Sequence, residues 1–222
     1  MTKLPLIFKD GHLFIRNDGA LWLFDTGAPS TFGISKDLIL AEKRFPVSDN
    51  YMGLSAATLS QFTGVGCQGL LGTDVFGAFD HILDVPSGSL TVSTGDLAHA
   101  GQDLEFSEFM GIPTLTARIA GQNYCMFFDT RAQISYFQED SITNFPEAGS
   151  VTDFYPGVGQ FETDTHQVPV SFGEISVTLR CGTLPGLLGA TLMMAGTSGI
   201  VGNQLCLDRV IGYFPRKGVL SL

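Results

Sequence analysis

The sequence is poor in basic residues and in charge of either sign. Lys and Arg number 12 against 22 Asp and Glu, the formal net charge is −10 at pH 7, and only 15% of residues are charged. An acidic surface repels phosphate groups, so we expect no nucleic-acid partner. The 44% hydrophobic content and the 27 Gly exclude a disordered chain and indicate a compact, β-rich protein with many turns.

Cysteine and histidine are also sparse, and neither forms a known metal or nucleophile motif. Cys67, Cys125, Cys181 and Cys206 lie far apart without the CxxC pairs of a zinc site, and the three possible disulfide pairings stay open. Cys125 and Cys206 stand in apolar segments, so we expect both thiols to be buried. The histidines are scattered, and neither HExxH nor GxSxG occurs. We expect no metal and no cofactor.

Apolar runs of the kind that direct a chain to a membrane are absent, with one ambiguous case. Met1–Pro5 lacks the apolar core of a signal peptide, which favours a cytoplasmic protein, although export by another route leaves no mark in the sequence. Residues 181–207 carry no charge and are long enough to span a bilayer. Pro185 and the many Gly, Ser and Thr instead predict the buried core of a soluble protein. We expect a monomer with no membrane partner.

One short motif occurs twice and organises the chain. The apolar run Leu21–Phe24 leads into Asp25-Thr26-Gly27-Ala28, and Met126–Phe128 leads into Asp129-Thr130-Arg131-Ala132. A single Asp after a strand is most often a turn residue or a helix cap. A buried carboxylate is costly unless it is paired or protonated, and the repetition supplies a pair. The two copies differ at the third position of the motif, which is Gly27 in the first copy and Arg131 in the second.

The surrounding segments repeat as well. Gly69–Val75 aligns without gaps with Gly199–Leu205, and a hairpin pattern follows each copy. Two copies of one supersecondary unit predict two similar lobes. We expect an N-terminal lobe at 1–100 with the first Asp loop, a linker at 101–112, and a C-terminal lobe at 113–222 with the second.

Other segments predict two helices and one long hairpin. Ser35 is a suitable cap for a helix over 36–45, and 139–145 predicts a second, shorter one. The span 151–180 holds a Gly-rich stretch between extended runs, which is typical of a long, mobile hairpin. Tyr155 near its tip either contacts a substrate or packs the stem.

The chain resembles the aspartic peptidases of pepsin and retroviral type over nearly its whole length. The motifs are DTGA at 25–28, DTRA at 129–132 and the apolar Gly-x-x-Gly strands at Gly69 and Gly199. Retroviral-type enzymes build one site from two identical subunits, and this chain resembles that arrangement fused into one polypeptide. The resemblance implies an all-β, two-lobed pseudo-twofold acid-protease fold with a few short helices and a cleft between the lobes.

The resemblance also implies roles for individual residues. Asp25 and Asp129 would share one proton at the cleft floor and activate a water for peptide hydrolysis. The hairpin would be a flap in the second half of the chain, whereas pepsin-type enzymes carry theirs in the first, where 47–65 leaves little room for one. The remaining site residues are the loop residues Thr26, Gly27, Thr130 and Arg131, and the flap residues Tyr155, Gly157, Val158 and Gly159.

Arg131 departs from the family pattern, which has Gly at this position. If its guanidinium lies near the dyad, it would lower the carboxylate pKa values and move the pH optimum toward acid. Alternatively, it turns aside to a surface acid. The resemblance therefore implies an aspartic endopeptidase that acts on peptides or proteins. One alternative is a catalytically impaired peptide-binding protein, and another is an interaction protein with no peptide in its cleft.

Overall fold

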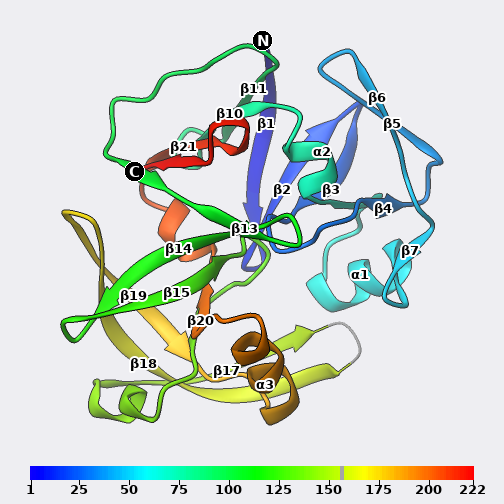
Figure 1. The fold of residues 1–222 in the computed structure, drawn as a ribbon. Helices are drawn as coiled ribbons and strands as arrows, with labels where there is room; N and C mark the ends of the chain where they lie inside the picture. The colour runs from blue at the N-terminus through cyan, green and yellow to red at the C-terminus, as the bar shows by residue number, and fades with distance from the viewer. Residues whose placement is uncertain (156–157) are drawn as a thin grey trace.

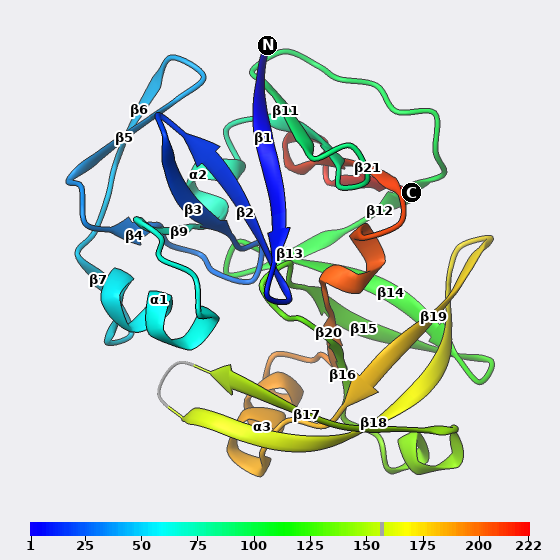
Figure 2. The same ribbon diagram turned by 180° about the vertical axis from the view of Figure 1, so that it is seen from behind.

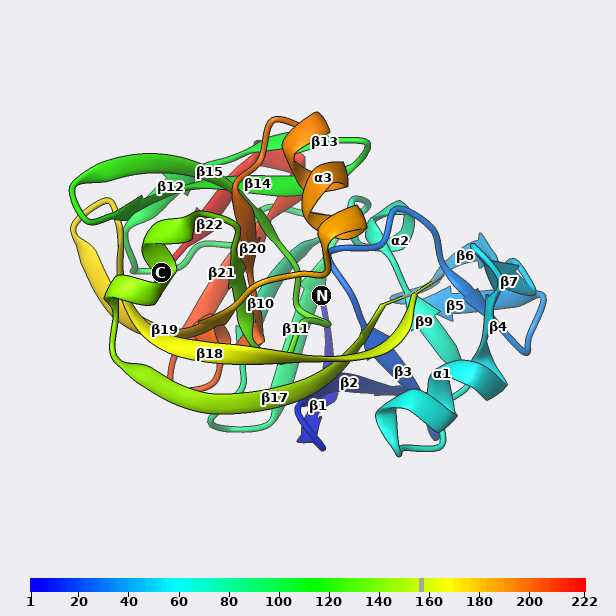
Figure 3. The same cartoon turned by 90° about the horizontal axis from the view of Figure 1, so that it is seen from below.

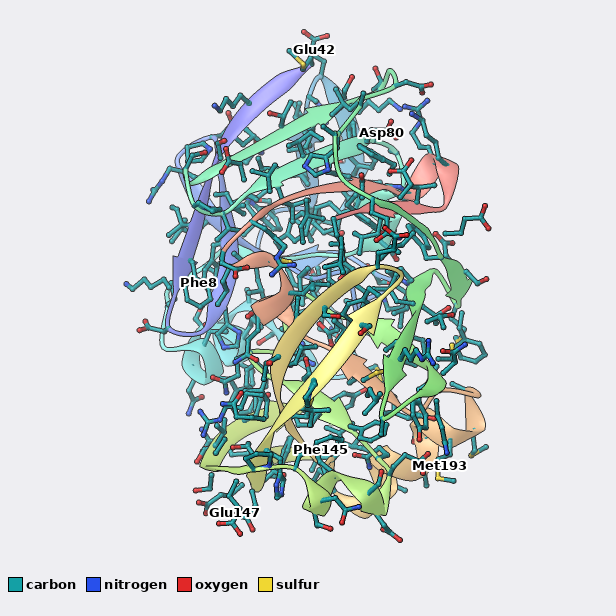
Figure 4. The ribbon with its side chains drawn as sticks, turned by 90° about the vertical axis from the view of Figure 1, so that its left-hand side faces the viewer. Phe8, Glu42, Asp80, Phe145, Glu147 and Met193 are labelled. Atoms are coloured by element: carbon teal, nitrogen blue, oxygen red, sulfur yellow. The ribbon has the colours of Figure 1, made fainter. Side chains whose placement is uncertain are left out.

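The structure, a computed structural model, describes residues 1–155 and 158–222. Most of this chain is in strands, and the helices are short. Two lobes are stacked in Figure 1, one holding the N-terminal strands in blue and the C-terminal strands in red, the other the green and yellow strands. In Figure 4, Glu42 and Asp80 lie toward one end of the molecule and Glu147 and Met193 toward the other. The predicted all-β fold is confirmed.

The larger sheet combines strands from both ends of the chain. Because β21 pairs with β10, the C-terminal hairpin joins the sheet of the N-terminal lobe (Figure 2). The expected boundaries at 100 and 113 therefore do not separate the sheets. Within the described residues this sheet has ten strands, in the spatial order β12 (Asp103–Glu105), β22 (Val219–Ser221), β21 (Val210–Phe214), β10 (Asp80–Asp84), β11 (Ser89–Ser93), β1 (Thr2–Lys9), β2 (His12–Asn17), β3 (Ala20–Phe24), β9 (Gly69–Leu71) and β4 (Phe32–Gly33).

The second sheet lies in the other lobe and carries two long hairpins, β17–β18 and β18–β19. As far as the chain is described, the sheet has eight strands, in the order β13 (Ser107–Phe109), β14 (Ile112–Ile119), β15 (Gln122–Phe128), β20 (Gly199–Val201), β16 (Ser135–Phe137), β19 (Ile175–Gly182), β18 (Gly159–Phe172) and β17 (Glu147–Tyr155).

The expected linker at 101–112 is itself structured, because β12 pairs with β22 in one lobe and β13 with β14 in the other.

Small elements complete the fold, and one of them corrects a prediction. The helix predicted over 36–45 is wrong, because Leu38 and Leu40 are buried on alternate positions of a hairpin whose turn, Ala41-Glu42, has positive φ. The segment predicted as helical over 139–145 is a 3₁₀ turn. The elements are β5 (Asp37–Leu40), β6 (Lys43–Pro46), β7 (Asn50–Tyr51), β8 (Leu54–Ser55), α1 (Ala56–Thr63), α2 (Thr73–Phe76), α3 (Gly186–Met194), η1 (Asp140–Asn144), η2 (Asn203–Cys206) and η3 (Pro215–Lys217).

The repeated Gly-x-x-Gly strands place the two Asp loops. β9 runs parallel to β3, and β20 runs parallel to β15. A Cβ on Gly69 would lie 2.1 Å from the Phe32 carbonyl, and one on Gly199 would lie 2.0 Å from the Tyr136 carbonyl. Only glycine permits this close approach of the neighbouring strand. Each Gly-x-x-Gly strand therefore lies between two strands. One of them, β3 or β15, ends at an aspartate, and the other, β4 or β16, is the closely packed neighbour.

The predicted burial of two cysteines and of the uncharged segment 181–207 is confirmed only in part. Cys206 is buried as expected, but Cys125 is exposed because its neighbour Met126 takes the inward-facing position on β15. The uncharged 181–207 segment is not uniformly core, since it forms α3, on which Met193 is 70% and Met194 89% exposed. Among the described helices, none is long and apolar enough to cross a membrane.

Candidate active site

The two Asp loops meet and brace each other reciprocally. The backbone N–H of Thr26 donates to Thr130 Oγ1 at 3.1 Å, and that of Thr130 donates to Thr26 Oγ1 at 3.0 Å. The Thr26 hydroxyl donates to the Phe128 carbonyl at 2.7 Å, and the Thr130 hydroxyl donates to the Phe24 carbonyl at 2.8 Å. Both threonines are fully buried. The four bonds fix the loops of the two lobes against each other.

The braces bring Asp25 and Asp129 into one buried site. Asp25 Oδ1 accepts the Gly27 N–H at 2.8 Å, and Asp129 Oδ1 accepts the Arg131 N–H at 2.8 Å. Gly27 lies so close to the opposite loop that a Cβ there would be 2.4 Å from Asp129 Cγ. The Oδ1 atoms are therefore held by backbone, while the Oδ2 atoms are left to face the site.

The Oδ2 atoms face the side chain of Arg131. Its Nε lies 3.4 Å from Asp25 Oδ2, and its Nη2 lies 3.7 Å from Asp129 Oδ2. Its Nη1 donates to the Phe154 carbonyl on β17 at 3.2 Å, and the residue is only 7% exposed. Arg131 does not turn aside to a surface acid. Its guanidinium bridges the two carboxylates and ties them to the long hairpin.

Burial and the second carboxylate outweigh the effect of Arg131 on the Asp25 pKa. Burial raises the pKa of Asp25 well above its ordinary value, and the neighbouring Asp129 charge raises it further. Arg131 lowers the Asp25 pKa, as expected of a nearby guanidinium, but by less than these two effects raise it, so the Asp25 pKa stays raised. Burial disfavours the charge on Arg131, but Asp129 and Asp25 outweigh it and raise the Arg131 pKa. The site therefore favours the protonated form of Asp25, next to a guanidinium whose own pKa is raised.

A second layer of buried groups surrounds Arg131. The His12 ring, on β2, donates from Nδ1 to the Arg131 carbonyl at 3.0 Å, and burial lowers the His12 pKa, which keeps this ring neutral. Asp153 on β17 is buried, accepts from the Tyr136 hydroxyl, and adds negative charge near the guanidinium. Arg131 is therefore fixed at its backbone by one lobe and at its side chain by the hairpin.

A cavity of about 200 Å³ opens above the dyad and is lined mainly by apolar side chains of both lobes. The small β7–β8 hairpin lies in the span expected to hold little room for a flap, and it contributes Tyr51 and Met52. The β13–β14 hairpin contributes Phe109 and Met110, and α3 contributes Leu192. Among the described residues, no group of three or more His, Cys, Asp or Glu side chains is arranged to hold a metal ion.

The threonine braces give a stability prediction. Thr26→Val leaves the buried Thr130 N–H and Phe128 carbonyl without partners, at about 1–3 kcal/mol each. We expect the free energy of unfolding in urea to fall by about 2–6 kcal/mol, and Thr26→Ser to restore most of it. Thr178→Val, exposed on β19, is the control and should change it by less than about 0.5 kcal/mol. A loss for Thr26→Val no larger than the control's would show that the braces carry no stability.

Comparisons with known proteins bear on the fold alone. No family model matches the chain, and no curated protein matches its sequence. Among solved structures, the chain is similar to the aspartic proteinase from Irpex lacteus, with a TM-score of 0.56 and 10% identity over 99% of this chain and 96% of that one. The fold is pepsin-like. The identity is too low to carry over activity or residue roles.

In this pepsin-like fold, the structure brings most of the predicted site residues together. Asp25, Asp129 and Arg131 line one cavity with Gly27 and Tyr155, and the threonines lie directly beneath. Val158 and Gly159 stand at the far end of the β17–β18 turn, Val158 being 40% exposed. Gly157 lies outside the described residues.

The sequence interpretation missed three buried residues around Arg131: His12 and Phe154, which contact it, and Asp153, whose charge acts on it. His12 and Phe154 lie far along the chain from Arg131. No local pattern in the sequence indicates that the strand holding Asp153 and Phe154 is buried at these positions. The position of Phe154 in the Phe154-Tyr155 pair next to the Gly-rich tip was the one available hint. An aromatic residue at the end of a long hairpin is well placed to reach another lobe.

Proposed function

We propose that this protein is an aspartic-type endopeptidase that hydrolyses peptide bonds with a water activated between Asp25 and Asp129. The observation that carries the proposal is the meeting of two buried aspartates from equivalent loops, braced reciprocally by Thr26 and Thr130, at the floor of an apolar cavity. Two carboxyl groups held so close in a dry site favour one shared proton, and aspartic proteases are the best-known example of such a pair.

The chemistry follows from the proton balance. Asp25, whose pKa is raised, serves as general acid and donates to the peptide carbonyl oxygen. Asp129 in its ionised form takes a proton from the water, whose oxygen attacks the carbonyl carbon. The tetrahedral intermediate then breaks at the C–N bond as Asp129 gives the proton that it took from the water to the leaving amine. Asp25 takes a proton back from a hydroxyl of the intermediate, which leaves a carboxylic acid and restores both aspartates. For this water to reach both Oδ2 atoms, the Arg131 guanidinium has to withdraw from them.

The apolar cavity supports a peptide with large apolar side chains near the cleaved bond. Tyr155 on the hairpin and Met52 on the opposite lobe both line the space above the dyad, which supports the hairpin as the proposed flap. Closing such a site excludes bulk water and strengthens the electrostatic interactions within it. The lobe division and the flap role are parts of this proposal.

A second candidate is a peptide-binding protein that does not cleave, and Arg131 is the observation that favours it. Its guanidinium lies against the two oxygens that would hold the water, and the residue is buried and fixed to the hairpin. If a bound peptide does not displace the Arg131 guanidinium, the protein binds the peptide in the cleft but does not cleave it.

Digestion of a peptide mixture separates the two candidates. Purified protein is incubated with the mixture between about pH 3 and pH 7, with and without a statine-type inhibitor, and products are identified by mass spectrometry. The endopeptidase proposal expects internal cleavage that the inhibitor blocks. Saturable peptide binding without any cleavage across this range would instead identify the binding protein.

A further inference from the structure

Three carboxyl groups surround the guanidinium of Arg131. The Oδ2 atoms of Asp25 and Asp129 lie 3.4 and 3.7 Å from its nitrogens. The negative charge of Asp153 acts on it from β17. When Asp25 holds one proton, two negative charges remain against one positive charge in this buried cluster. A buried charge that loses its partner destabilises a protein strongly. The cation therefore leaves either the dyad or Asp153 without a guanidinium against it.

Asp153 is a buried carboxylate whose two oxygens both accept hydrogen bonds. It is only 5% exposed, its Oδ1 accepts the Phe154 N–H at 2.7 Å, and its Oδ2 accepts the Tyr136 hydroxyl. Burial, followed by the Asp153 charge, raises the pKa of Tyr136, so this hydroxyl stays protonated and donates. Among the described residues, Arg131 is ion-paired with the dyad rather than with Asp153. Asp153 is thus a second acceptor that the guanidinium does not yet use.

The two residues that flank Asp153 are bonded to the second Asp loop. Gln133 Nε2 donates to the Thr152 carbonyl at 2.9 Å, and Arg131 Nη1 donates to the Phe154 carbonyl at 3.2 Å. Beyond them the β17–β18 hairpin extends toward α1 of the other lobe, as Figure 3 shows, and the Phe154 ring stacks there on a phenylalanine of α1. Asp153 is therefore held at a fixed place next to the loop that carries the guanidinium.

The tether to β17 allows Arg131 to exchange partners over a short path. Its Nη1 is bonded to the residue next to Asp153, while its Nε and Nη2 face the dyad. Rotation between staggered side-chain conformers turns these two nitrogens from the dyad toward β17. A guanidinium has five N–H donors, enough to keep the Phe154 carbonyl and bind a carboxylate as well.

We propose that Asp153 is a positioning residue that receives the Arg131 guanidinium when a ligand reaches the dyad. In the free protein the guanidinium lies against the Oδ2 atoms of Asp25 and Asp129. With a ligand bound it pairs with Asp153, and the dyad keeps one proton without a cation in contact. Asp153 acts through Arg131 and does not touch the reacting atoms. The peptide nature of the ligand rests on the proposed function, but the exchange of carboxylate partners does not.

Removal of both dyad charges tests the exchange without any peptide. In the ligand-free double variant Asp25→Asn/Asp129→Asn, Asp153 is the one carboxylate left of the three. A crystal structure is expected to show a guanidinium nitrogen of Arg131 about 2.7–2.9 Å from an Asp153 oxygen. A guanidinium that stays beside the two substituted side chains and away from Asp153 would overturn the proposal.

Calorimetry with a statine-type peptide tests the same exchange with a ligand. Asp153→Asn removes the second acceptor, so the fraction of protein with a free dyad falls, and the peptide should bind at least about tenfold more weakly. In the Arg131→Met background there is no guanidinium to receive, so Asp153→Asn should change the affinity by less than about twofold. Asp164→Asn, the same substitution at an exposed position of β18, is the control and should bind as the parent does.

The comparison of the two backgrounds separates a positioning role from a structural one. An equal loss of affinity with Arg131 and with Arg131→Met would show that Asp153 only supports the hairpin, and it would overturn the proposal. Parent-like binding by folded Asp153→Asn would overturn it too. If the statine-type peptide binds no form of the protein, the proposed function fails, and the structure of the ligand-free double variant still decides where Arg131 goes.

Discussion

Asp25→Asn and Asp129→Asn are each expected to reduce peptide cleavage by at least about 10²–10⁴-fold, the range for loss of a positioned acid or base. Asn keeps the shape of the side chain and can still accept the backbone N–H of Gly27 or Arg131 at Oδ1, so the fold should be retained. Cleavage is followed by mass spectrometry and folding by circular dichroism. Asp37→Asn, at an exposed position of β5, is the control and should cleave as the parent does. Substantial cleavage by either folded dyad variant would exclude the proposed mechanism.

Asp25→Asn also gives a prediction for how the free energy of unfolding depends on pH. Because the folded-state pKa of Asp25 is raised, the native state binds more protons than the unfolded state above the ordinary Asp pKa. The contribution of Asp25 to the free energy of unfolding therefore falls as pH rises from the ordinary Asp pKa to the raised one. Below the ordinary Asp pKa this loss is absent. Asp25→Asn should be more stable than the parent at neutral pH, and the difference should shrink as pH falls to about 4. A difference that is constant with pH would show that the Asp25 pKa is unshifted.

Arg131→Gly is expected to raise the cleavage rate by about tenfold or more between about pH 5 and pH 7 and to move the optimum upward. Loss of the guanidinium frees both Oδ2 atoms for the water and removes an influence that lowers the Asp25 pKa, so Asp25 keeps its proton to higher pH. The measurement is kcat/KM against pH for one peptide. Circular dichroism checks folding, since loss of one member of a buried charge cluster costs about 3–5 kcal/mol.

Two further variants separate charge from hairpin release. Arg131→Met keeps a long side chain without charge, so it should shift the optimum as Arg131→Gly does. Arg180→Gly removes a guanidinium that holds the carbonyls of Ala148 and Ser150 on β17, away from the dyad, and should leave the optimum unchanged. An equal or lower rate for folded Arg131→Gly would refute an inhibitory role. Peptides with and without Glu near the cleaved bond would then test whether Arg131 grips an acidic side chain.

The repeat made the centre of the molecule predictable. Asp25 and Asp129 follow equivalent strands, and the Gly-x-x-Gly segments mark where a neighbouring strand approaches too closely for any Cβ. These are local signals that survive in the sequence, because each depends on a backbone requirement at a named position. The placement of the two loops, the short helical turns after the Gly-x-x-Gly strands and the C-terminal hairpins all follow from them.

The features that were wrong or missed depend on long-range packing. Leu38 and Ile39 fit a helix as well as a strand, and only the burial of Leu38 and Leu40 on one side decides for the hairpin. The Asp25 pKa depends on how dry the site is, which no sequence pattern reports. Phe154 enters the opposite lobe because of where the hairpin ends in space.

The most direct measurement is a crystal structure of the protein with a statine-type inhibitor. We expect the statine hydroxyl to lie about 2.6–3.2 Å from Oδ2 of both Asp25 and Asp129, with the Arg131 guanidinium displaced from those atoms. An inhibitor bound elsewhere, or a hydroxyl that contacts neither carboxylate while Arg131 still bridges them, would contradict a catalytic dyad.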